Sequence, residues 1–105
     1  MISNIKNDLV NASELKKIGK NREALKLYQK AYEKDPEEFT INQKIDYAWT
    51  IYNVKIQKSD NVDEILSCSE FITQLLSQKD LNTTRNCVYT SCVFKVLNCL
   101  NKKQE

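Results

Sequence analysis

The sequence predicts an all-α fold of about five helices that pair as antiparallel hairpins. The 105 residues include one Gly and one Pro, whereas average usage would give about seven and five. Because these residues break helices most strongly, their scarcity favours few turns and long helices. Apolar residues also recur at helical spacings of three and four along most of the chain. The length suffices for one modest core, and we expect residues 1–105 to form a single domain.

The first two helices are expected from about Ser3 to Ile18 and from Asn21 or Arg22 to Lys34. Gly19 is expected to end the first helix, since glycine favours the position just past a helix end. Asn21 is a suitable N-cap for the second. The predicted inward positions of this pair are Ile5, Leu9, Ala12, Leu15, Ala24, Leu27, Tyr28 and Ala31.

The third helix is expected to be long, from about Pro36 to Lys58. The residue before a proline avoids helical geometry, so the second helix should end at that point. Asp35 is expected to cap the third helix, with Pro36 at its first position and Glu38 completing a capping box. Its main apolar face would consist of Ile41, Ile45, Ala48, Trp49, Tyr52 and Ile56.

Two further helices follow the polar break at residues 59–61. Asp60 or Asn61 should cap a fourth helix that extends to about Gln78, and a fifth is expected from about Thr83 to Asn101. Residues 88–100 are rich in β-branched side chains, which leaves a non-helical structure open there, but their length without a turn favours a helix. The inner side of the fourth helix would carry Ile65, Cys68, Ile72, Leu75 and Leu76.

Composition excludes several functional classes. The chain contains no His, so a Ser-His or Cys-His catalytic pair cannot form. A single Gly cannot build a glycine-rich phosphate loop. The four cysteines include no Cys-x-x-Cys pair, which argues against a zinc site. We therefore expect neither an enzyme nor a cofactor or metal.

Charge and hydropathy point to a cytoplasmic protein without nucleic acid or membrane as partner. The net charge is +2, from 16 basic and 14 acidic residues, whereas nucleic-acid-binding domains usually show a strong basic excess. The first twenty residues lack the apolar core of a secretory signal. No window approaches the length of apolar sequence that a transmembrane helix needs.

One segment of the chain carries a repeat pattern. Ala24, Tyr28, Ala31 and Pro36 follow the spacing A-x3-F…A…P, with Tyr in place of Phe. Upstream, Ala12, Leu15 and Gly19 occupy the small, large and turn positions. Residues 5–38 thus resemble one tetratricopeptide repeat, most specifically over 12–36 and weakly after about residue 56. Asp8 and Asn11 depart from the pattern, because they stand where the family has Trp and Leu.

The resemblance implies a short right-handed solenoid of stacked hairpins. Residues 39–80 would form a longer second hairpin, and residues 83–101 the first half of a third unit. This chain would then be one domain, either complete or the N-terminal part of a longer protein. The alternative is an unrelated helical bundle in which Ala24, Tyr28 and Ala31 serve only as core.

In tetratricopeptide proteins the first helix of each hairpin lines a groove that binds peptides or helices. The resemblance therefore implies a groove, and an acidic segment would suit its lysines. The stripe of Tyr47, Ile51 and Val54 has an alternative interpretation as core. The groove residues projected by helical spacing are Lys6, Leu9, Ser13, Lys16, Lys17, Gln43, Tyr47, Thr50, Ile51, Val54, Arg85 and Tyr89.

The fifth helix is more apolar than a terminal helix should be, since the ends of solenoids need a polar outer face. Something outside this segment should cover it, either a second copy of the protein or further chain. Val93, Phe94, Leu97 and Leu100 are the candidate self-association residues.

The predicted function is that of a non-catalytic interaction module or scaffold. It would bind a peptide or helical segment of a protein partner, or self-associate as an oligomer through its last helix. Two alternatives stay open: a helical nucleic-acid-binding module, and a regulatory bundle with a small ligand in a cavity lined by Tyr47, Trp49 and Tyr89.

Overall fold

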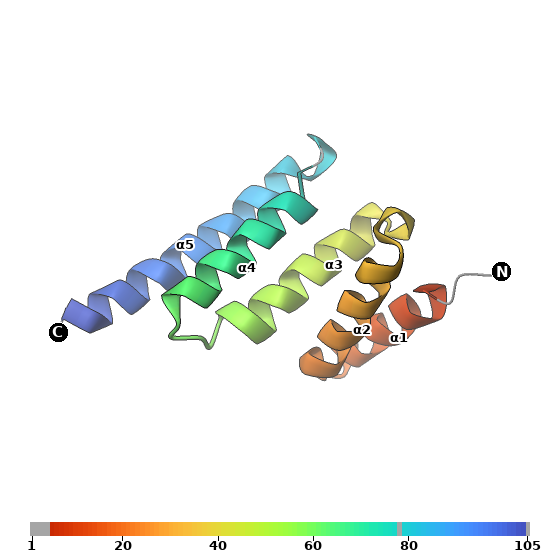
Figure 1. Ribbon diagram of the computed structural model, residues 1–105, viewed down its shortest axis with the longest axis horizontal. Helices are drawn as coiled ribbons and strands as arrows, with labels where there is room; N and C mark the ends of the chain where they lie inside the picture. Colours follow the sequence, from red (N-terminus) through yellow and green to blue (C-terminus); the bar gives the residue numbers. More distant parts are fainter. Residues whose placement is uncertain (1–4, 78, 105) are drawn as a thin grey trace. The chain divides into compact units, whose positions relative to one another are not determined.

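The computed structural model describes residues 5–77 and 79–104, and within these residues all regular structure is helical. The prediction of an all-α chain with about five helices is confirmed for this part of the protein. The chain divides into two compact units, residues 1–50 and residues 51–105. The α-helices are α1 (Ile5–Lys17), α2 (Asn21–Lys34), α3 (Ile41–Ile51), α4 (Val62–Leu75) and α5 (Asn82–Gln104) (Figure 1).

A tight turn joins α1 and α2 into the hairpin of the first unit. Gly19 has a φ of 84°, in the left-handed region that favours glycine. The Lys20 N–H donates to the Leu15 carbonyl at 2.8 Å, and the Gly19 N–H donates to the Lys16 carbonyl at 3.1 Å. These bonds satisfy two carbonyls in the last turn of α1. The predicted helix stop is confirmed, but Lys20 and not Asn21 takes the N-cap position of α2.

Small residues let the two helices of this hairpin approach closely. Ala12, Ala24 and Ala31 are completely buried, and Tyr28 of α2 has 1% of its surface exposed. Leu25 is buried where the helical pattern predicted Leu27, which is half-buried. Leu15, also predicted to face inward, is half-buried. The predicted inward face is confirmed for Ile5, Leu9, Ala12, Ala24, Tyr28 and Ala31.

Four rings form the aromatic cluster of the first unit: Tyr28, Tyr32, Phe39 and Tyr47. The ring centroids of Tyr28 and Tyr47 are 5.6 Å apart and the rings are nearly parallel, at 21°. Tyr32 meets Phe39 edge-on, at 5.3 Å and 85°. Offset stacking and edge-to-face contacts are the favoured arrangements of aromatic pairs. The cluster therefore joins α2 to α3 within this unit.

The helix expected to begin at Pro36 begins five residues later. Residues Pro36–Glu38 form a short 3-10 turn (η1), and no side-chain bond from Asp35 caps it. A capping box forms instead between Thr40 and Gln43: the Gln43 N–H donates to Thr40 Oγ1 at 3.2 Å, and the Thr40 N–H donates to Gln43 Oε1 at 2.8 Å. The prediction was wrong because two capping patterns lie in succession, and Phe39, buried between them, is held in extended conformation.

A π-helical segment, η2 (Tyr52–Ile56), follows α3 directly. Its widened turn is marked by the Gln57 N–H, which donates to the Tyr52 carbonyl five residues back, at 2.8 Å. The division between the two compact units lies just before it, between Thr50 and Ile51. Such single-turn widenings are uncommon in helices.

The second unit is built on the hairpin of α4 and α5, which pack against each other (Figure 1). Asn61 caps α4, as predicted, by accepting a bond from the Glu64 N–H at 3.2 Å. At the same end of the pair, the Cys99 thiol of α5 lies 3.7 Å from the Ser59 carbonyl, which precedes α4. The buried residues of this unit include Ile56, Ile65, Ser69, Ile72, Leu75, Leu76, Leu81, Val88, Cys92 and Cys99.

Candidate interaction surface

One side of α5 is used for packing within the second unit. Val88, Cys92 and Cys99 recur at helical spacing and are at most 6% exposed. Three residues next to this buried side of the helix are half-buried: Thr84, Ser91 and Lys95. The apolar residues that remain on α5 must therefore point elsewhere.

The α5 apolar face consists of five exposed side chains: Tyr89, Val93, Phe94, Leu97 and Leu100. Their exposed fractions are 50%, 40%, 63%, 49% and 43%. At 100° per residue, the four other than Phe94 fall within an arc of roughly 80°, and Phe94 flanks it. The helix is thus apolar on two sides, one packed in the hairpin and one open to solvent.

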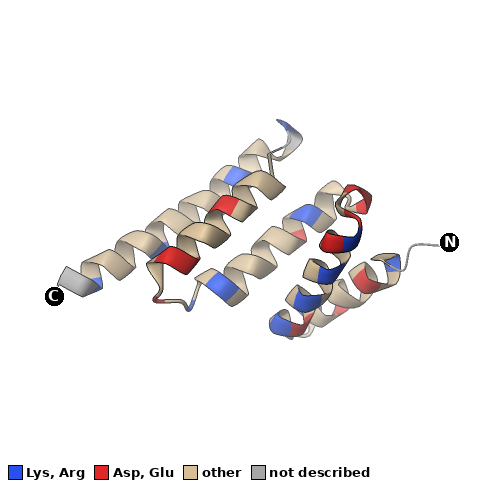
Figure 2. Cartoon of the chain, viewed as in Figure 1, with Lys and Arg blue, Asp and Glu red and all other residues tan. Residues whose placement is uncertain are grey.

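No charged side chain lies within this arc. Residues 82–104 contain no Asp or Glu, and Lys95 and Lys102 fall on the opposite side of the helix by its periodicity. Arg85, one turn before Tyr89, is half-buried. Figure 2 shows α5 mostly tan, whereas α2 carries closely spaced charges along its length.

Three of the four cysteines of the second unit are buried or half-buried, and Cys87 is exposed. Burial raises the pKa of Cys92, and for Cys68 burial and the nearby Glu64 raise the pKa of the thiol. Since the thiolate is the reactive form, these two thiols are held in the unreactive state. Among the residues whose positions are described, no three Cys, Asp or Glu side chains gather as a metal site.

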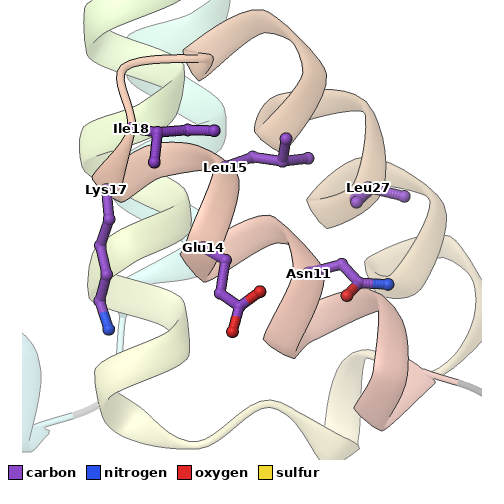
Figure 3. Close-up of a pocket in the computed structure, with 6 residues that line it drawn as sticks. All are labelled: Asn11, Glu14, Leu15, Lys17, Ile18 and Leu27. Carbon is purple, nitrogen blue, oxygen red and sulfur yellow. The ribbon is translucent and has the colours of Figure 1, made fainter.

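The first unit has an open pocket of about 660 Å³ between α1 and α2 (Figure 3). Leu15 and Leu27 are half-buried, whereas Ile18 is 68% exposed. The polar residues at this pocket, Asn11, Glu14 and Lys17, are exposed. A ligand site usually places a few polar groups inside an apolar enclosure, and this pocket has its polar groups at the solvent side.

Several residues predicted to line a groove are buried. Leu9 is 3% exposed because it packs in the first hairpin, and Tyr47 is 3% exposed because its ring stacks on Tyr28. Thr50 is also buried, and its hydroxyl donates to the Asp46 carbonyl at 2.6 Å. With Ile51 4% exposed, this corrects the expectation for four of the groove residues. For Tyr47 and Ile51 the interpretation as core applies.

Two further groove candidates have structural partners in the first unit. Lys16 Nζ lies 3.2 Å from Asp46 Oδ1, so this side chain links α1 to α3. Gln43 caps α3. Of the others, Lys6, Lys17 and Tyr89 are exposed, and Ser13, Val54 and Arg85 are half-buried.

The predicted groove residues are divided between the two units. Eight of them, from Lys6 to Thr50, belong to the first unit, and Ile51, Val54, Arg85 and Tyr89 belong to the second. Tyr89 instead joins the predicted self-association residues on one face of α5. The spacing of four, four and three from Tyr89 to Leu100 is the sequence signal that unites them.

Comparison of the chain with protein-family models, with curated proteins and with solved structures found no match. No helix in the described residues combines the length and the apolar character needed to cross a membrane. Five of the large apolar side chains that the structure exposes lie on α5, in its apolar face.

Proposed function

We propose that this chain is a non-catalytic protein–protein interaction module whose contact surface is the α5 apolar face. The observation that carries the proposal is the exposure of five large apolar side chains on one helix. Scattered exposed apolar residues are normal, but contiguous apolar patches mark sites of interaction. Here the five residues follow one another along the helix within 12 positions.

The energetics favour contact through this face. Complete burial of a large apolar side chain contributes about 1.5–3 kcal/mol. Side chains that are 40–63% exposed have realised only part of this contribution within the fold. Tyr89 and Phe94 supply aromatic groups of the kind that dominate binding at protein interfaces. The neighbouring Asn86, Thr90 and Asn101 are exposed, neutral and polar, and would form the rim.

A tetratricopeptide-like architecture is part of the same proposal. Its support is the packing of the first hairpin, where Tyr28 and alanines on both helices are buried. The ion pair between Lys16 and Asp46 also links α1 to α3, the helices that would be the first of two successive repeats. In such an architecture the chain would act as a scaffold that presents helices to partners.

The small-ligand alternative has less support. The cavity expected for it would use Tyr47 and Tyr89 as walls, but Tyr47 packs in the aromatic cluster and Tyr89 is half exposed. The pocket of the first unit is lined by neither. Nucleic-acid binding would need a concentrated basic face, and the α5 apolar face carries no charge.

Site-specific photo-crosslinking tests the proposal. A photoreactive phenylalanine analogue replaces Phe94 in the full chain, and in a matched control it replaces Asn98, one turn further on the polar side of α5. In the cells that express the protein, position 94 should form protein adducts and position 98 should not. Adducts at neither position, or equally at both, would contradict an interaction through this face.

A further inference from the structure

We infer that the occupant of the α5 apolar face is a second copy of this chain, with the two α5 helices paired antiparallel about a two-fold axis. This inference rests on the proposed function and names the partner. Three properties of the face carry it: its lack of charge, the spacing of its residues and its size.

The lack of charge makes the face compatible with itself. In a two-fold contact the same patch is presented by both copies, so a patch of one sign repels its own copy and requires an oppositely charged partner. The arc from Tyr89 to Leu100 contains no charged residue, and Lys95 and Lys102 project from the other side of the helix. Apolar side chains meet their own kind without penalty. An acidic partner, in contrast, would find no cation within this arc.

The spacing of the face is symmetric. The midpoint between residues 89 and 100 is 94.5, and the midpoint between residues 93 and 97 is 95. A two-fold axis at this point of α5 places Tyr89 opposite Leu100 of the other copy and Val93 opposite Leu97. Both pairings therefore form in the same antiparallel register. Phe94, the most exposed of the five, is level with this point along the helix and lies at the flank of the contact.

The size of the face sets the expected strength. Residues 89–100 cover roughly 16 Å of helix at 1.5 Å per residue. Stable interfaces usually bury about 800 Å² per partner, and a single face of this length offers less. The pairing should therefore be reversible and depend on concentration, with a dissociation constant in the micromolar range or weaker.

Light scattering of the full chain as a function of concentration tests the inference. The measurement uses a reducing buffer, because Cys87 is exposed and its oxidation would link two chains through a disulfide. The wild-type mass should rise from 12.3 kDa towards twice that value as concentration increases to the millimolar range. Leu97→Glu introduces two like charges across the axis and should weaken association at least tenfold. Asn98→Glu adds the same charge at the adjacent, polar position and should leave association unchanged.

Phe94→Glu serves as a second variant if Leu97→Glu alters the helical circular dichroism. A wild-type chain that stays monomeric at millimolar concentration overturns the inference, as does equal association of the Leu97 and Asn98 variants. The crosslinking result separates this failure from failure of the proposed function. If position 94 forms adducts only with a different protein, the inferred homodimer is overturned and the proposed interaction function is supported. If no adduct forms at all, both the homodimer and the interaction function are contradicted.

Discussion

The second helices of the two hairpins, α2 and α5, bury similar narrow faces but present opposite chemistry to their surroundings. The exposed face of α2 is charged, whereas that of α5 is apolar over its middle and later turns. The outer face of α2 is therefore suited to solvent once its inner face is packed, whereas the outer face of α5 still exposes apolar side chains. The exposed charged residues of α2 are Arg22, Glu23, Lys26, Lys30, Glu33 and Lys34.

The contrast is clearest between two tyrosines. Tyr28 of α2 is 1% exposed and contacts two rings of the aromatic cluster, whereas Tyr89 of α5 is 50% exposed. The same residue type is a core residue in one hairpin and a surface residue in the other. The apolar content of a helix therefore does not reveal its role until the buried face is known.

Replacement of Tyr28 and replacement of Tyr89 should lower the free energy of unfolding by very different amounts. The loss for Tyr28 is the largest effect expected. Tyr28→Ala should lower the free energy of unfolding of the first unit by about 3–5 kcal/mol, as large-to-small substitutions of buried aromatic residues do. Tyr89→Ala should change the stability of a monomeric chain by less than about 1 kcal/mol. Urea unfolding followed by fluorescence of Trp49, the single tryptophan, measures the first unit. Similar losses for the two variants would contradict the contrast.

Alkaline pH should weaken the first unit through its buried tyrosines. Burial, with a smaller effect of Asp46, raises the pKa of Tyr28 from 10.0 to about 12, and burial raises the pKa of Tyr47 further above its ordinary range. Because the unfolded chain releases these protons near pH 10 and the folded chain retains them, the contribution to stability is complete below pH 10. It is lost as the pH rises through about 12.

The double variant Tyr28→Phe/Tyr47→Phe isolates this effect, because phenylalanine keeps the rings and removes the titrating hydroxyls. Its stability should fall less steeply between pH 10 and 12 than that of the wild type, as measured by urea unfolding. Tyr89→Phe is the matched control and should follow the wild-type profile. If the double variant loses stability as steeply as the wild type, the tyrosines are not the cause.

Helix caps offer a smaller, paired test of the two units. Thr40→Ala removes the capping box of α3, and Asn61→Ala removes the cap of α4. Each should lower stability by about 1 kcal/mol, the first in the unit reported by Trp49 and the second in the other. Hydrogen exchange of backbone amides near each helix start measures both. Unchanged exchange at residues 41–44 in the Thr40 variant would show that the box contributes nothing.

The smallest effect is expected for the ion pair of the first unit. Lys16 and Asp46 have side chains that are 26% and 44% exposed, and ion pairs this accessible usually contribute at most about 1 kcal/mol. Lys16→Met should therefore cost less than any cap substitution, and the difference should shrink at high salt. A loss as large as that of Tyr28→Ala would mean that the pair organises the α1–α3 contact.

Local signals in the sequence predicted much of this fold. Gly19 and Asn61 act within one helical turn, so their roles follow from residue type and position. The start of α3 was missed because Asp35 and Thr40 each begin a sequence that resembles a capping box. The choice between them depends on the burial of Phe39 against rings of α2, which is a tertiary contact.

The candidate site was predictable only in part. Helical periodicity identified α5 as too apolar, but it could not show which of its two apolar sides packs on α4. It also gave α3 two apolar stripes, and the burial of Tyr47 depends on Tyr28, nineteen positions earlier. Periodicity defines faces, whereas the partner of each face is determined by residues distant in the sequence.

Contacts between copies, measured by nuclear magnetic resonance, are the sharpest test of the proposed pairing of α5 helices. A sample that mixes isotope-labelled and unlabelled chains at millimolar concentration reports only intermolecular proximity. If α5 pairs with a second copy, contacts should appear between the methyl groups of Val93 in one copy and Leu97 in the other, and between the Tyr89 ring and the Leu100 methyl groups. Absence of intermolecular contacts from α5, or contacts only from the charged face of α2, would contradict this pairing.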